Sequence, residues 1–456
     1  MAEPIAANLE GLGQAMPDVT IVGAGWAGLA CAVSLTEQGA RVALVDAAPT
    51  VGGRGRTVRI ELAGQPLKLD NGQHLLVGAY HRTLEFVDKL GSEALPGLDR
   101  HRMCLAMPEK GFLLGRAALP GRLGHLVGLL RARGLTWRDR IAMARLIEGL
   151  RMRRWRHTAV TVADLFRAFG QSRPICDLLW IPLCVGALNT APEHACARAF
   201  IAVLRDSLGG AGGDSDFLWP AGTLGELLPE PALRWLARRE VVPRLGCLAQ
   251  GILPDADGWR LSIREASPVS SAAIVVATPP SNAARLLREL APGVANGLDR
   301  FEMAPIATVY LAWPQACELP RIAMLVDEPG RGRPGQWLFD RGVHAGLRVG
   351  AVVISDGGRF PQVSPDRLAE LVAAQVRSLG LPPSLDARAI VERRATFRCV
   401  PGRPRLDASS VQRELGSGAR IFLAGDYLDP EYPATLESAI RAGLAAAQRV
   451  RESLGG

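Results

Sequence analysis

The feature that most constrains the fold is a short apolar run that leads into a glycine-rich turn. Val19–Val22 suit a buried parallel strand. Three glycines follow in the spacing G-x-G-x-x-G, namely Gly23, Gly25 and Gly28. The first permits a tight turn, the second lets the backbone approach a pyrophosphate, and the third lets a helix pack close to the strand. Asp46 ends the next apolar run, where an acid accepts hydrogen bonds from a ribose hydroxyl. The pattern predicts a dinucleotide-binding unit; the alternative is a glycine-rich turn without a ligand.

A second glycine turn, Gly52-Gly53-Arg54, lies shortly after Asp46. Domains that bind nicotinamide dinucleotides do not need this turn. It resembles the turn found at this place in flavoproteins of the amine oxidase and phytoene desaturase superfamily. The resemblance implies FAD as the cofactor, with Gly53 and Arg54 near its phosphates.

The C-terminal part of the chain resembles the same superfamily. One apolar run ends at Gly425-Asp426, and Thr435-Leu436 open an Ala-rich helix. The resemblance implies that Gly425 and Asp426 meet the pyrophosphate and ribityl chain, and that backbone groups of Thr435 and Leu436 contact the flavin. It also implies that the backbone of Leu248 contacts the adenine. The sequence departs from the common Glu-Gly pair at this helix start, because it carries Glu437-Ser438.

Segments in the middle of the chain narrow the resemblance. They are Asp70–His74, Leu179–Cys184, Ala187–Thr190, Leu204–Leu208 and Ser215–Pro220. As a set, over residues 18–450, they resemble the squalene-associated flavoproteins, the bacterial hydroxysqualene dehydroxylases. Carotenoid desaturases and generic amine oxidases share the two ends of the chain but not this set. The resemblance implies reductive removal of the hydroxyl of hydroxysqualene to give squalene, a precursor in isoprenoid and hopanoid biosynthesis.

The resemblance also implies that the segment containing Gly72, Gln73 and His74 passes the flavin ring. Gly72 would allow close backbone approach, and Gln73 and His74 would lie near the reacting face. His74 could equally be a hydrogen-bonded structural histidine.

The implied reaction needs a proton donor, because an allylic alcohol leaves as water once it is protonated. The polar candidates for a catalytic role are His74, Asp206 and Asp216. The two aspartates could equally pair with Arg205 or cap helices. No second dinucleotide fingerprint is visible in the sequence, so the external electron donor is not identified.

We predict an α/β fold with a Rossmann-like FAD-binding domain and an α+β substrate domain of the amine oxidase type. The first glycine turn and the Gly425-Asp426 segment lie about 400 residues apart, so the FAD-binding domain is discontinuous. We assign residues 18–80, 206–284 and 394–452 to the FAD-binding domain. Residues 81–205 and 285–393 are assigned to the substrate-binding domain.

The net charge of +8 comes almost entirely from arginine. Residues 122–156 hold ten arginines and only two acids, Asp139 and Glu148, with apolar residues at helical spacing. This pattern predicts two amphipathic helices joined around Gly134, the second capped by Thr136 with Asp139. Such helices can lie on an anionic membrane surface, and the alternative is an arginine-coated surface. No nucleic-acid-binding module is evident.

The location is expected to be cytoplasmic, with peripheral contact at the inner membrane surface. No run of about 18 apolar residues predicts a transmembrane helix. Residues 1–16 lack a basic region followed by an apolar stretch, so we expect no secretory signal. The eight cysteines form no CxxC pair and suit reduced, mostly buried thiols. The spacing of Cys184, His194 and Cys196 fits no standard metal site, and none is predicted.

Three other functions stay open. Amine oxidation commonly uses a lysine near the flavin, supplied from the later part of the chain, but no lysine follows Lys110. Carotenoid desaturation would use the same fold on a longer polyene. The third is a non-catalytic, flavin-bound scaffold for isoprenoid synthases.

Overall fold

The computed structural model describes residues 16–91, 98–210, 213–220, 222–358, 360–416 and 418–455. Residues 1–15, which carry most of the segment tested above for a secretory signal, lie outside this range. A four-stranded parallel sheet in the order β19-β13-β1-β2 forms one side of the molecule. Its strands are β1 (Val19–Val22), β2 (Val42–Val45), β13 (Ala273–Val276) and β19 (Ile421–Leu423). Strands from three distant parts of the sequence therefore lie side by side.

The parallel sheet forms because its strands are short apolar runs that are buried on both faces. Every residue of β1, β13 and β19 is buried. In the parallel register Val19 lies opposite Ala273 on one side and Val42 on the other. Near-continuous apolar runs are typical of such sheets, since helices or a second sheet cover each face.

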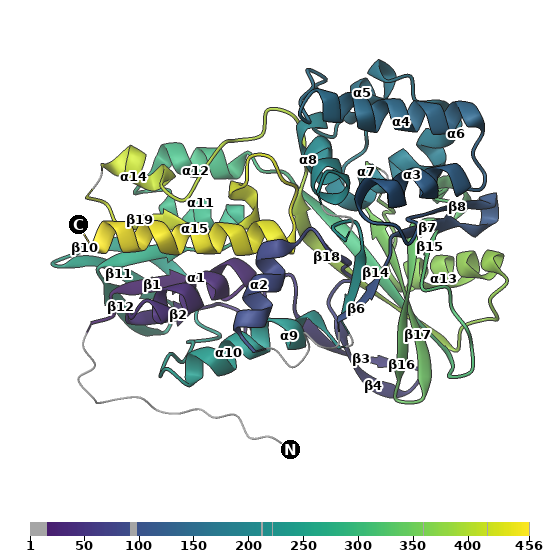
Figure 1. Cartoon of the computed structure of the whole chain (residues 1–456). Helices are drawn as coiled ribbons and strands as arrows, with labels where there is room; N and C mark the ends of the chain where they lie inside the picture. The colour runs from purple at the N-terminus through teal and green to yellow at the C-terminus, as the bar shows by residue number, and fades with distance from the viewer. Residues whose placement is uncertain are drawn as a thin grey trace.

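Two long helices, α1 (Trp26–Glu37) and α15 (Leu436–Leu454), pack closely together beside this sheet (Figure 1). A Cβ on Gly443 of α15 would lie 2.2 Å from the carbonyl oxygen of Ala27, so only glycine permits this approach. A three-stranded sheet lies nearby. Its strands are β10 (Ala249–Asp255), β11 (Gly258–Ile263) and β12 (Ala266–Ser271).

The other side of the molecule is built on a five-stranded sheet in the order β15-β16-β17-β14-β18. The strands are β14 (Met303–Pro314), β15 (Ile322–Met324), β16 (Trp337–His344), β17 (Leu347–Ser355) and β18 (Asp386–Phe397). All of their pairings are antiparallel. Helix α13 (Pro365–Val376) packs on this sheet, and a group of helices lies on its far side (Figure 1). That group is α3 (Gly121–Arg131), α4 (Trp137–Met152), α5 (Val162–Ala168), α6 (Arg173–Ile175), α7 (Ile181–Leu188) and α8 (Ala197–Leu208).

Smaller elements connect the two sides. Two of them are strand pairs: β3 (Thr57–Leu62) with β4 (Gln65–Asp70), and β7 (Cys104–Met107) with β8 (Phe112–Gly115). A third is a small sheet in the order β5 (Leu76–Val77), β9 (Phe217–Pro220) and β6 (Leu98–His101). The remaining helices are α2 (His81–Lys89), α9 (Leu224–Leu227), α10 (Pro229–Ala237), α11 (Pro280–Leu287), α12 (Pro292–Asp299) and α14 (Ser410–Leu415). Strand β9 pairs with strands on either side of a predicted domain boundary, and the boundaries themselves stay a prediction.

The predicted cap of the second helix in the arginine-rich region is confirmed. Thr136 caps α4, accepting the N–H of Asp139, whose carboxylate accepts the N–H of Thr136. Thr161 and Asp164 form the same reciprocal pair at the start of α5. Such capping boxes satisfy two backbone donors that the helix leaves unpaired. Among the described residues no helix is both long and apolar enough to cross a bilayer.

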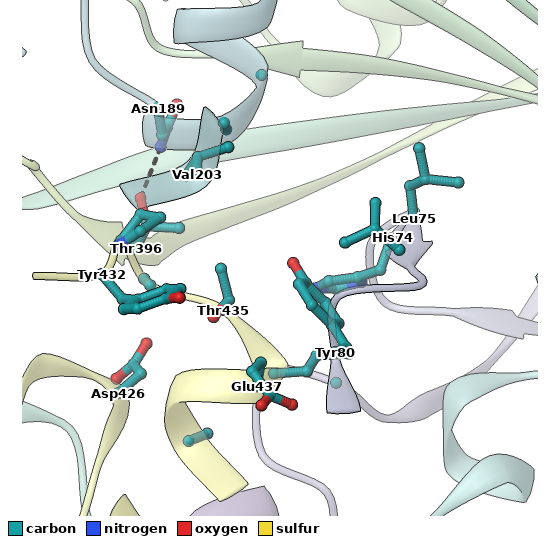
Figure 2. Close-up of a pocket in the computed structure, with 18 of the residues that line it drawn as sticks. His74, Leu75, Tyr80, Asn189, Val203, Thr396, Asp426, Tyr432, Thr435 and Glu437 are labelled. Atoms are coloured by element: carbon teal, nitrogen blue, oxygen red, sulfur yellow. Dashed lines mark hydrogen bonds between the residues drawn. The ribbon is translucent and has the colours of Figure 1, made fainter. Parts of the chain in front are cut away.

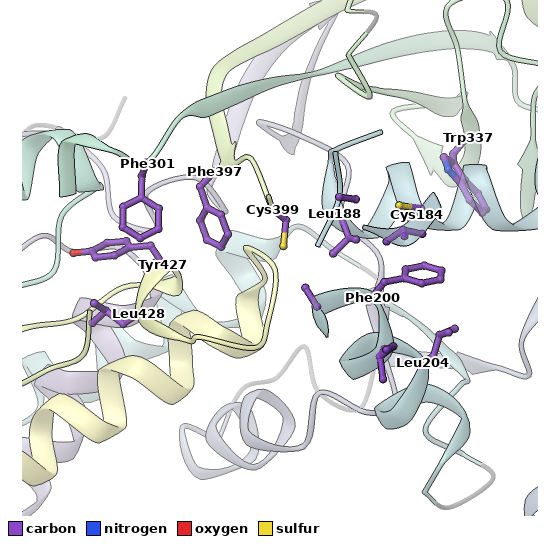
Figure 3. Packing of buried hydrophobic residues seen from close by; sticks show 14 of the residues in the cluster. Cys184, Leu188, Phe200, Leu204, Phe301, Trp337, Phe397, Cys399, Tyr427 and Leu428 are labelled. Carbon is purple, nitrogen blue, oxygen red and sulfur yellow. The ribbon is translucent and has the colours of Figure 1, made fainter. Parts of the chain in front are cut away.

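A shared apolar core joins the two sides of the molecule (Figure 3). The ring centroid of Phe301 lies 5.7 Å from that of Phe397 on β18 and 5.6 Å from that of Tyr427, which directly follows the Gly425-Asp426 segment. Edge-to-face contacts of this kind add to the stability gained from burial. The core therefore fixes the Gly425-Asp426 segment against the five-stranded sheet.

The mixture of a parallel sheet, an antiparallel sheet and covering helices agrees with the predicted α/β class.

Candidate active site

A cavity of about 1420 Å³ runs between the two sides of the molecule. Its walls come from the first glycine turn, the Asp70–His74 segment, helices α3, α4, α7 and α8, the five-stranded sheet and the start of α15. All of the predicted site residues line it except Gly28 and Asp216. The volume exceeds the range of about 300–1,000 Å³ that is usual for a single small ligand, so a dinucleotide and a further ligand both fit.

Gly23 and Gly28 make the close contacts that the spacing predicts, and Gly25 lies beside open space. Gly23 has φ +112°, and a Cβ there would lie 2.5 Å from the carbonyl oxygen of Ala277. A Cβ on Gly28 would lie 1.8 Å from the carbonyl oxygen of Gly23, so Gly28 sets the contact between helix and strand. Gly25 lines the cavity, and its nearest neighbour would be the Cα of Gly53 at 4.0 Å. The space in front of Gly25 is therefore free for a ligand.

The N-terminus of α1 is a ready site for an anion. Gly25 is the N-cap residue and supplies no side-chain cap, and the first turn of the helix contains no acid. The first N–H groups of a helix have no partner inside it, and the helix dipole places positive charge there. This donor set fits the pyrophosphate of FAD.

Asp46 lies at the carboxyl end of β2 and faces the cavity. Its Oδ2 accepts the N–H of Ala24 at 2.5 Å, and its Oδ1 accepts the N–H of Ala48 at 2.7 Å. Each carboxylate oxygen can accept a further hydrogen bond, so the residue fits a ribose. The N–H of Cys247 donates to the carbonyl oxygen of Asp46 at 2.8 Å, and this bond holds Leu248 in the cavity wall close to the same strand.

The second glycine turn brings Arg54 to the C-terminal segment. Gly52 and Gly53 both have positive φ, at +100° and +58°. The guanidinium of Arg54 donates to the carboxylate of Asp426 at 2.8 Å and to the carbonyl oxygen of Ala395 at 2.8 Å. Arg54 and Asp426 both line the cavity, so the structure unites two residues predicted from opposite ends of the chain.

The contacts at the start of α15 explain why the chain carries Glu437-Ser438 in place of the common Glu-Gly pair. The Ser438 hydroxyl accepts the N–H of Thr435 at 3.0 Å and so completes a capping box. The buried Glu437 carboxylate turns toward α2, where it accepts the N–H and the hydroxyl of Thr83, each at 2.8 Å. The N–H groups of Leu436 and Glu437 are the first two of the helix and have no acceptor within it. The positive end of α15 therefore faces the cavity, which Thr435, Leu436 and Glu437 line.

His74 is positioned by a short hydrogen bond within its own segment. Its Nδ1 lies 2.7 Å from the carbonyl oxygen of Gly72. A carbonyl can only accept, so Nδ1 carries the proton and Nε2 of the neutral ring is an acceptor. Burial lowers the pKa of His74, as do the charges of Arg54 and Arg341, while the bond to Gly72 opposes them. A neutral His74 presents a lone pair and can act as an acceptor for a hydroxyl.

The two aspartates predicted as catalytic candidates differ in position. Asp206 lines the cavity, and its carboxylate accepts from Nε of Arg205 at 2.7 Å, as the alternative interpretation expected. Asp216 is buried outside the cavity lining, and Arg116 donates to its Oδ1 at 2.7 Å. Asp216 thus neutralises the mostly buried Arg116, and the geometry gives its catalytic role no support.

Several polar residues of the cavity were missed by sequence reasoning (Figure 2). Burial and the charge of Glu437 both raise the pKa of Tyr80, so its phenol stays protonated and can donate. Tyr432 accepts from Arg205 at 3.2 Å, and the Asn189 amide donates to the Thr396 hydroxyl at 2.9 Å. A single tyrosine or asparagine in the sequence carries no pattern that could have identified these positions.

The part of the cavity beneath α3, α4, α7 and α8 is mostly apolar. Its walls include Leu129, Met143, Ile147, Leu179, Trp180, Leu183, Phe200, Leu204, Phe217, Trp337 and Phe339. None of the three lysines of the chain lines it. No cluster of metal-ligating side chains occurs among the described residues, and all eight cysteines are free. This chamber suits a long apolar ligand.

Comparison with known proteins agrees with the geometry. The chain matches the family described as flavin containing amine oxidoreductase over residues 26–451. It is 29% identical to a hydroxysqualene dehydroxylase of Rhodopseudomonas palustris, over 95% of this chain and 98% of that protein, and 26% identical to one of Sinorhizobium fredii, over 94% and 97%. The fold is shared with a putative protoporphyrinogen oxidase from Exiguobacterium (TM-score 0.70, 16% identity, 97% of this chain and 100% of that one). The family match confirms FAD, which the donor set fits. The chain therefore belongs to the family of flavin-containing amine oxidoreductases.

Proposed function

We propose that this FAD-dependent oxidoreductase removes the hydroxyl of hydroxysqualene reductively and gives squalene. The observation that carries the proposal is one continuous cavity, in which the space beside the nucleotide-binding groups opens into an apolar chamber. The two relatives described above are named for this reaction and align with almost the whole chain. An apolar chamber excludes water and competing nucleophiles from a carbocation-like centre.

In the proposed reaction the carbon–oxygen bond of the allylic alcohol breaks, and water leaves after the oxygen gains a proton. Reduced FAD, when bound, supplies the hydride that forms the new carbon–hydrogen bond. The chain must therefore hold the hydroxyl and deliver a proton to it. Tyr80 and His74 suit the first of these tasks, because the protonated phenol of Tyr80 can donate a hydrogen bond to the hydroxyl and Nε2 of His74 can accept one. The raised pKa of Tyr80 makes its phenol a weak acid, so we assign delivery of the proton to no residue. In Figure 2 both side chains point toward the same part of the cavity.

Product analysis under anaerobic conditions tests the proposal. The holoprotein is reduced with dithionite, mixed with hydroxysqualene in detergent, and the extract is analysed for squalene. Squalene is the expected product, and a loaded, reducible protein that forms none would contradict the proposal. The same assay with a phytoene-type polyene and with a primary amine separates the reaction from carotenoid desaturation and amine oxidation.

We also propose that the protein works in the cytoplasm, in peripheral contact with the inner face of a membrane. The support is the excess of arginine over residues 122–156 and the strongly apolar character of the proposed substrate and product. A polybasic surface is attracted to anionic lipid.

A further inference from the structure

Helix α3 turns Gly124 and Gly128 inward and three of its four leucines outward, while Leu129 lines the cavity. The buried residues of this helix are Gly124 and Gly128. A Cβ on Gly128 would lie 2.1 Å from the carbonyl oxygen of Gly115, so α3 packs by its backbone against the end of β8. The outward leucines Leu123, Leu126 and Leu130 are 57%, 52% and 49% exposed. They recur at intervals of three and four residues and so form one outward stripe. A surface helix of a water-soluble protein normally turns its apolar stripe toward the core and its polar residues toward solvent.

The first turns of α4 add to this apolar surface. Trp137 is 63% exposed and Ile141 is 57% exposed. We name the surface formed by Leu123, Leu126, Leu130, Trp137 and Ile141 the α3–α4 face. Exposed apolar side chains that gather in this way, within an arginine-rich rim, mark an interaction site rather than ordinary surface.

The cavity reaches the outside at this face. Leu123 and Leu126 line the cavity although each is more than half exposed, so they stand at its mouth. On α4, Glu148 also lines the cavity, and Ile141 lies seven residues before it on the same side of the helix. Arg122 of α3 donates to Glu148 at 2.7 Å, which places an ion pair between the two helices at the mouth. Arg151 donates to the same carboxylate at 3.0 Å.

The charge around the face selects an anionic partner. Of the two acids among the ten arginines of residues 122–156, Asp139 caps α4 and Glu148 is paired at the mouth. A second copy of the chain seated on this face would bring arginines against arginines. An anionic bilayer accepts both the apolar stripe and the positive rim.

We propose that the α3–α4 face docks on an anionic bilayer, and that the mouth between Leu126 and Glu148 is the port through which the isoprenoid passes from the bilayer into the cavity. The identity of that isoprenoid rests on the proposed function. Exposed ion pairs are weak, so lipid phosphates that bind Arg122 release Glu148 and widen the port. The substrate then reaches the apolar chamber without crossing water.

Vesicle binding tests the docking surface without reference to catalysis. The holoprotein is floated with vesicles of phosphatidylcholine alone or with phosphatidylglycerol. The test variant carries Leu130→Ser, Trp137→Ser and Ile141→Ser, none of which lines the cavity. The matched control carries Leu253→Ser and Leu385→Ser, whose side chains are 49% and 57% exposed elsewhere on the surface.

We expect binding to phosphatidylglycerol vesicles that the test variant loses by roughly 100-fold, because three apolar side chains no longer enter the bilayer. The control should bind as the wild type does. Equal binding by all three proteins would overturn the docking surface. A second result would also overturn the docking surface: a wild-type protein that is a dimer and does not bind vesicles, and a test variant that is a monomer. The α3–α4 face would then be covered by a second copy of the chain.

Substrate delivery tests the port. With hydroxysqualene dissolved in detergent, the test variant should turn over at the wild-type rate. With hydroxysqualene embedded in phosphatidylglycerol vesicles, its rate should fall at least tenfold below that of the wild type and the control. An equal rate from vesicles, in a variant that has lost vesicle binding, would overturn the port. Absence of squalene from the wild type in detergent would instead contradict the proposed function and leave the vesicle-binding result standing.

Discussion

Replacing Gly25 with alanine should weaken FAD binding while leaving the fold of the apoprotein intact. A Cβ at this position points into the cavity, and its nearest neighbour is 4.0 Å away. Gly28 provides the matched contrast, because its Cβ would lie 1.8 Å from the carbonyl oxygen of Gly23 and 2.9 Å from the attached carbon. The first substitution fills space that the cofactor needs, and the second forces α1 away from β1.

The magnitudes follow from these contacts. In Gly25→Ala the methyl group holds the pyrophosphate away from one or two backbone N–H donors, each worth about 1.5–3 kcal/mol to a charged acceptor. A total loss of about 2–4 kcal/mol corresponds to a rise in the Kd for FAD of about 30- to 700-fold. In the apoprotein, alanine is a poorer N-cap than glycine but restricts the unfolded chain, and the two effects of about 1 kcal/mol or less oppose each other. Gly28→Ala should destabilise the apoprotein by about 3 kcal/mol or more.

Two measurements check this prediction. Fluorescence titration of apoprotein with FAD gives the Kd, and thermal unfolding followed by circular dichroism gives the apoprotein Tm. Gly25→Ala should change the Tm by no more than about 3 °C, and Gly28→Ala should lower it much further or prevent folding. The reasoning is refuted if Gly25→Ala binds FAD as tightly as the wild type, or if it is as unstable as Gly28→Ala.

Three further predictions concern groups around the cavity. Glu437→Ala removes the acceptor of the Thr83 N–H and hydroxyl at the start of α2 and should lower the free energy of unfolding by about 2–4 kcal/mol, measured by urea denaturation, with Glu437→Gln retaining part of it. Asp426→Ala leaves the partly buried Arg54 guanidinium without its carboxylate, which should cost about 1–3 kcal/mol in the apoprotein by the same measurement; no change would contradict the pairing. Because burial lowers the folded pKa of His74 below its ordinary value of 6.5, its contribution to stability is complete above 6.5 and is lost as the pH falls toward the folded pKa. The Tm of His74→Gln should therefore decline less than that of the wild type between pH 7 and pH 5.

The nucleotide-binding part of the site could be predicted because local sequence dictates it. Gly23 and Gly28 are required by contacts within a few residues or with one neighbouring strand, and Gly25 leaves free space at the cavity wall. The helix starts at Thr136 and Thr161 were predictable for the same reason, since a capping box spans only four residues.

The rest depends on contacts between distant segments. Asp216 was predicted as a catalytic candidate from its motif, but the sequence does not reveal that Arg116, 100 residues away, holds its carboxylate outside the cavity. The choice of which face of α3 points toward solvent also depends on a distant contact. The helical spacing of apolar residues predicted an amphipathic helix, but only the close approach of Gly128 to Gly115 shows that Leu123, Leu126 and Leu130 face outward.

The most direct test of the central claim is a single turnover in deuterated water. A hydrogen on reduced FAD exchanges with solvent, so the hydride that the cofactor delivers becomes deuteride. Reduced holoprotein is mixed anaerobically with one equivalent of hydroxysqualene, and the flavin spectrum and the product are followed together. The proposal predicts one squalene per flavin oxidised, with one deuterium on the carbon that carried the hydroxyl. Flavin that stays reduced, or an eliminated polyene without deuterium at that carbon, would contradict it.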